Sequence, residues 1–111
     1  MTHAEIDEYL LSFPNAWLDF PFGEETAVYK VGHKETGEGK LFALVAVDSK
    51  PTRISLKTDP TLSETLRERY EEVQPGYHLN KRHWITIINT GQLNDDEIKD
   101  LARLSYQLAT A

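Results

Sequence analysis

The apolar residues of this chain fall into short, strand-length runs joined by short polar connections, and this pattern restricts the fold more than any other feature. A strand that pairs in parallel with its neighbour needs a crossover of a dozen or more residues, whereas antiparallel strands need only a tight turn. The connections are mostly of the second kind, so we expect a mainly antiparallel sheet. Its five predicted strands cover residues 26–31, 41–47, 53–57, 77–79 and 84–88.

Three local sequence patterns mark the starts of predicted helices. Thr2 and Glu5 have the spacing of a capping box, in which each side chain bonds the backbone of the other residue. Asp59 before Pro60 is an N-cap followed by a proline at the first helical position, and Asn94 caps an acidic first turn. The residues at helical spacing, which predict the inward face of each helix, are Ile6, Leu10 and Phe13, with Tyr9, for the first helix, Leu62, Leu66 and Tyr70 for the second, and Ile98, Leu101, Ser105 and Leu108 for the third.

The element order is therefore α-β(3)-α-β(2)-α, which predicts a two-layer α+β fold with a mainly antiparallel five-stranded sheet packed by helices. Residues 13–23 carry Trp17, Phe20 and Phe22 together with two prolines. We expect them to form a loop whose rings pack over the core. The stretch 32–40 is a predicted polar hairpin loop.

With 111 residues, the chain has the length of one domain, 1–111. It has no cysteine, which excludes disulfides, a thiol nucleophile and cysteine-bound zinc or iron–sulfur clusters. No apolar run approaches the roughly 18 residues of a membrane span, and the N-terminus lacks the pattern of a secretory signal. We therefore expect a cytoplasmic protein with no membrane partner.

The common catalytic and metal-binding patterns fail on spacing. Gly32 and Gly37 are followed by Glu38 rather than by the Lys-Ser/Thr of a phosphate loop, and the serines lack a nucleophile-elbow context. His78 and His83 are five residues apart across a predicted turn, which does not suit a zinc site. We expect no metal, no cofactor and no enzymatic activity.

The net charge of −6 opposes a nucleic-acid partner, yet residues 73–92 contain no acidic residue at all. Within this window, residues 75–84 combine hydrogen-bond donors with aromatic rings, a mixture that suits phosphate contacts, base edges or stacking. The candidate binding residues for a nucleic acid or ligand are Lys57, Tyr77, His78, Asn80, Lys81, Arg82 and His83. Trp84 is expected to head a buried strand instead.

This segment and four other short motifs resemble the signatures of the MmcQ/YjbR family, and the resemblance covers essentially the whole chain. The matching motifs are residues 19–23 (Asp-Phe-Pro-Phe-Gly), 55–60 (Ser-Leu-Lys-Thr-Asp-Pro), 66–67, 75–84 and the pair Ser105-Tyr106. The resemblance implies a fold similar to the secretion-chaperone-like and frataxin-like domains. It also implies DNA binding, with a double-wing motif, but no catalytic residue and no cofactor.

Three functions remain open at this stage. The leading hypothesis is weak, salt-dependent DNA binding through Lys57 and the 78–83 segment. The second is a protein- or peptide-binding adaptor that uses a sheet edge or a helix face. The third is a small-ligand-binding domain centred on Lys57, Tyr77, His78 and Asn80, which a well-formed pocket beneath the 20–22 loop would favour.

Overall fold

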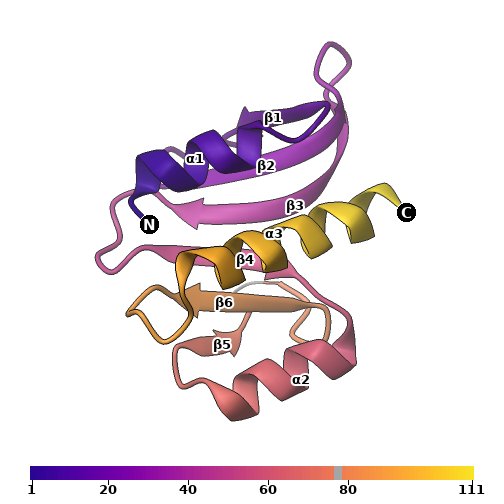
Figure 1. Ribbon diagram of the computed structural model, residues 1–111. Coiled ribbons are helices and arrows are strands. Elements are labelled where there is room, and N and C mark those ends of the chain that lie inside the picture. Colours follow the sequence, from indigo (N-terminus) through magenta and orange to yellow (C-terminus); the bar gives the residue numbers. More distant parts are fainter. Residues whose placement is uncertain (77–78) are drawn as a thin grey trace.

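The computed structural model describes residues 1–76 and 79–111 and has three helices on a six-stranded sheet (Figure 1). The helices are α1 (His3–Leu11), α2 (Pro60–Arg69) and α3 (Asp95–Thr110). The strands are β1 (Ala16–Asp19), β2 (Thr26–His33), β3 (Glu38–Ala46), β4 (Arg53–Lys57), β5 (Val73–Pro75) and β6 (Trp84–Ile88). The predicted α+β class is confirmed.

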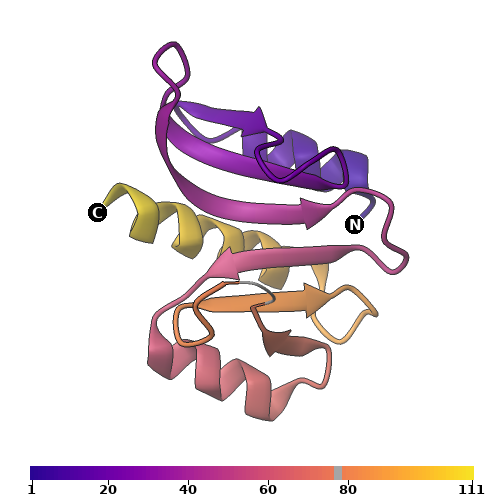
Figure 2. The ribbon, with the colours of Figure 1, turned by 180° about the vertical axis from the view of Figure 1, so that it is seen from behind.

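All neighbouring strands pair antiparallel in the order β1-β2-β3-β4-β6-β5, as the short connections predicted. Helices α1 and α3 lie across one face of this sheet, and α2 packs beside β5 and β6 at one end. From behind, the strands are in front of α1 and α3 (Figure 2). We call this second face the open face.

The helices begin where the local signals place them. Thr2 accepts from the backbone of Glu5 and Glu5 accepts from the backbone of Thr2, which completes the capping box. Asp59 accepts from the Leu62 backbone at 2.9 Å, and Asn94 caps α3 in the same way. Each cap satisfies backbone N–H groups that a helix would otherwise leave unpaired.

The core lies between the sheet and its helices. Ile6 and Leu10 of α1 and Leu66 of α2 are buried there as predicted. In α3 the predicted inward residues are right except for Leu108, which is 39% exposed. Ala109, four residues after Ser105, is buried in its place, because a stripe that continues at i+4 passes over Leu108.

The sheet has six strands rather than five because residues 16–19 of the predicted loop form β1. Ala16 and Leu18 pack toward the core, while Trp17 and Asp19 occupy the alternate positions. A tight turn at Asn15, with φ of 60°, precedes this strand. Pro14 and Pro21, on either side of this strand, favoured the prediction of a loop, although core-facing and open-face side chains alternate between them.

Two other boundaries differ from the sequence prediction. The edge strand β5 is Val73–Pro75 rather than 77–79, of which residues 77 and 78 lie outside the described residues. A proline is tolerated there because an edge strand does not need every backbone donor. The β2–β3 connection is only residues 34–37, since both strands extend into the predicted loop, and it projects beyond the sheet (Figure 1).

The aromatic rings of residues 13–23 differ in burial. Phe13 stacks on Tyr106 and meets Phe42 edge-on, with ring centroids 4.6 and 5.9 Å away, so this ring packs over the core as expected. Phe20 and Phe22 are instead 43% and 66% exposed, and for them the expectation is wrong.

In the part of the chain that the structure describes, no helix has the length and apolarity needed to cross a bilayer.

Candidate functional site

The segment before β6 is a compact turn. The side-chain oxygen of Asn80 accepts a hydrogen bond from the Arg82 backbone at 2.9 Å, and the His83 backbone donates to the Asn80 carbonyl at 3.1 Å. Asn80 thereby shapes the turn with its own amide, as asparagine does in Asx turns. Lys81 and Arg82 are exposed at its tip, and His83 is half-buried.

Lys57 lies beside this turn, on the neighbouring strand. It is the last residue of β4 and pairs with Trp84, and the Thr58 backbone continues the ladder by donating to the His83 carbonyl at 2.7 Å. The structure thus joins five of the seven candidate residues, Lys57 and 80–83, which we call the basic turn. The other two, Tyr77 and His78, lie outside the described residues.

Trp84 has a structural position beside this turn. The residue is 9% exposed, and its carbonyl accepts a hydrogen bond from the Gly76 backbone at 3.0 Å. A Cβ at position 76 would lie only 2.6 Å from the Trp84 Cβ. Glycine therefore permits the backbone at position 76 to lie this close to Trp84. A buried ring does not offer a free face for stacking on a base. The expectation that Trp84 heads a buried strand is therefore confirmed.

The charges are divided between the two faces. Helices α1 and α3 carry seven acidic and two basic side chains, which accounts for five of the six excess negative charges of the chain. On the open face, Arg53 and Lys57 alternate with the core residues Ile54 and Leu56 of β4. Neither of these cations forms an ion pair with any described residue.

Asp19, an acidic residue at an open-face position of β1, is neutralised locally. Its carboxylate accepts from the Lys30 ammonium at 3.0 Å and from the Phe20 backbone at 2.9 Å. The hydrogen bond from Lys30, followed by the one from Phe20, lowers the pKa of Asp19. The same Lys30 ammonium lies 5.1 Å from the centre of the Trp17 ring. This cluster ties β1 to β2.

The open face also contains a cavity of about 370 Å³. Among the described residues, its walls combine apolar side chains, hydroxyls and one cation: Phe22, Thr26, Leu44, Ala46, Arg53, Ser55, Leu79 and Thr86. The hydroxyls of Ser55 and Thr86 lie 2.8 Å apart and hydrogen-bond to each other. Phe22 belongs to the 20–22 loop, so a pocket of the kind that would favour the third hypothesis is present. Of the residues on which that hypothesis centred, Lys57 and Asn80 do not line it, and Tyr77 and His78 lie outside the described residues.

Sequence reasoning missed the residues that hold the connection between β6 and α3 in place. Glu72 is buried and its carboxylate accepts from the Thr90 backbone at 2.8 Å, from the Thr90 hydroxyl and from the Leu93 backbone. The Gln92 side chain in turn accepts from the Glu72 backbone at 2.9 Å. A glutamate beside a helix end usually lies in solvent, and no local signal marked this one.

The family model described as YjbR matches residues 11–108, nearly the whole chain. The chain belongs to the YjbR family. This confirms the resemblance drawn from the motifs.

Among the relatives, YjbR of Escherichia coli K12, itself described as uncharacterised, is 38% identical over 110 residues, covering 98% of this chain and 87% of the relative. YbdF of Escherichia coli O157:H7, also described as uncharacterised, is 33% identical over 106 residues, covering 96% of this chain and 82% of the relative.

Solved structures of the same architecture exist. DR2400 of Deinococcus radiodurans, described as a DUF419 domain, has a TM-score of 0.92 at 36% identity, covering 98% of this chain and 78% of its own. A crystal structure of a Pseudomonas syringae protein has a TM-score of 0.79 at 28% identity, covering 98% of this chain and 99% of its own.

Proposed function

We propose that this protein binds nucleic acid weakly through the basic turn, as a non-enzymatic protein of the cytoplasm. The observation that carries the proposal is the meeting of Lys57 with residues 80–83 through the Thr58–His83 hydrogen bond. Three cations, Lys57, Lys81 and Arg82, then belong to one end of the sheet. Cations that hold no carboxylate partner are free to contact phosphates.

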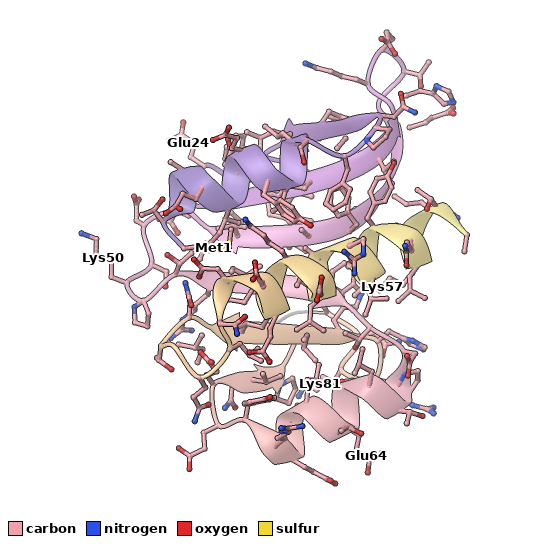
Figure 3. The ribbon with its side chains drawn as sticks, in the orientation of Figure 1. Met1, Glu24, Lys50, Lys57, Glu64 and Lys81 are labelled. Carbon is pink, nitrogen blue, oxygen red and sulfur yellow. The ribbon has the colours of Figure 1, made fainter. Side chains whose placement is uncertain are left out.

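The separation of charge supports the same interface. The acids of α1 and α3 repel a polyanion from the helix-covered face, while the basic turn attracts it over the Debye length of about 8 Å at physiological salt. Glu24 and Lys50 lie at the other end of the sheet from Lys57 (Figure 3). Because the attraction is short in range, binding should be weak and governed by phosphate contacts rather than by base sequence.

The test is a fluorescence-anisotropy titration of labelled duplex and single-stranded DNA at two salt concentrations. Three phosphate contacts predict a log–log salt slope of about −3 on duplex DNA and about −2 on a single strand. The double variant Lys81→Glu, Arg82→Glu should abolish binding.

The matched control is Lys34→Glu, Lys50→Glu, which produces the same change in net charge at exposed sites away from the basic turn. It should weaken binding only slightly. If both double variants weaken binding equally, net charge rather than the basic turn governs it. If the wild type shows no binding at low salt, the proposal is wrong.

A further inference from the structure

We propose that the open-face cavity binds a small monocarboxylate with an apolar body, such as an aryl or branched aliphatic acid. This site is separate from the basic turn, because none of the residues of the turn lines the cavity. It therefore does not depend on nucleic-acid binding.

The size of the cavity restricts the ligand. A volume of about 370 Å³ is near the lower end of the ~300–1,000 Å³ typical of small-molecule sites. Leu44 and Ala46 of β3 form part of the floor. Phe22 comes from the connection between β1 and β2, and Leu79 from the connection between β5 and β6. Such walls remove an apolar group from water but offer it no hydrogen bonds.

The charge of the cavity restricts the ligand further. Arg53 is the only charged residue among the described lining residues, and its guanidinium has no ion pair with the described part of the chain. A guanidinium binds a carboxylate through two parallel hydrogen bonds. One unpaired cation beside an apolar floor is complementary to one negative charge on an apolar body.

The positions of the polar side chains in the cavity predict how a carboxylate ligand would be oriented. Ser55 and Thr86 occupy facing positions on β4 and β6, and their hydroxyls form the polar part of the wall. Arg53 is two residues before Ser55 on the same strand and so on the same face. A ligand with its carboxylate toward Arg53 would lay its apolar end against Leu44 and Phe22.

The experiment uses phenylacetate as the probe and the methyl resonances of Leu44, Ala46 and Leu79 as the readout in NMR titrations. We expect saturable shifts of these methyls. The uncharged isostere phenylacetamide should bind about five- to tenfold more weakly, because it lacks the charge-assisted bonds to an exposed guanidinium. Acetate, which lacks the apolar body, should also bind more weakly.

Arg53→Gln should remove the preference for phenylacetate over phenylacetamide, whereas Lys50→Gln, an exposed cation that does not line the cavity, should preserve it. Ala46→Leu should block binding of both compounds, because the larger side chain would fill the cavity above its floor. The Lys81→Glu, Arg82→Glu variant should bind phenylacetate as the wild type does, which separates this site from the proposed function.

Four outcomes would overturn the proposal. They are the absence of saturable shifts, equal affinity for phenylacetate and phenylacetamide, equal affinity for phenylacetate and acetate, and an unchanged preference in Arg53→Gln. Chemical-shift dispersion of each variant shows that it is folded, so that a loss of binding is attributable to the cavity.

Discussion

Ser105 of α3 accepts a hydrogen bond from the backbone N–H of Lys57 at 2.8 Å, through a side chain that is fully buried. The same hydroxyl donates to the carbonyl of Phe42. Strands β3 and β4 pair only over residues 43–45 and 54–56, so the hydroxyl bridges the strands just beyond their last paired residues. Ser105 thereby fixes the end of β4, where Lys57 joins the basic turn.

Replacing Ser105 by alanine should lower the free energy of unfolding by about 1–3 kcal/mol, because the Lys57 N–H and the Phe42 carbonyl would both lose a buried partner. Urea denaturation measures this change. Thr110→Ala, which removes an exposed hydroxyl from the same helix, should stay within about 0.5 kcal/mol of wild type. Equal effects of the two substitutions would argue against the bridge.

The Glu72 carboxylate holds the connection between β6 and α3. Glu72→Gln should cost about 1–3 kcal/mol, because the amide keeps a single acceptor oxygen and turns an N–H₂ group toward donors. Native-state hydrogen exchange should show faster exchange of the Thr90 and Leu93 amides. Glu71→Gln, at the exposed neighbouring position, is the control and should change neither amide.

Leu66 tests the inward face of α2. It is 9% exposed within the core, and truncation to alanine should cost about 2–5 kcal/mol through lost burial and the cavity that remains. Leu104→Ala, at a leucine that is 40% exposed, should cost much less. A loss below about 0.5 kcal/mol for Leu66→Ala in denaturant titrations would show that the helix does not bury this side chain.

The Asp19–Lys30 pair should contribute stability that depends on pH. The pKa of Asp19 is lower in the folded protein than in the unfolded chain, so its contribution is present above the unfolded value of about 3.9 and is lost as the pH falls through the lower folded value. The stability difference between wild type and Asp19→Asn should therefore be largest near neutral pH. It should shrink in acid, as measured by urea denaturation across the pH range. A difference that grows on acidification would contradict the pairing.

The sequence by itself determined the features that depend on neighbouring residues. The starts of all three helices follow from caps at Thr2, Asp59 and Asn94, since each cap bonds a backbone group three residues away. The strands 53–57 and 84–88 were predicted to the residue, because β-branched and aromatic side chains favour a pleated, buried surface. The seven candidate binding residues were likewise predicted from short stretches of the sequence.

The tertiary structure decided what depends on contacts between distant segments. The order β4-β6-β5 brings Lys57 to His83, and no local rule specifies which strands become neighbours. Strand β1 exists because β2 pairs with it, and the cavity exists because Phe22, Arg53 and Leu79 meet over one face. Burial of Glu72 is likewise stabilised by donors about twenty residues away. Pairing and burial across such separations depend on the whole chain folding together, and short-range sequence patterns do not contain them.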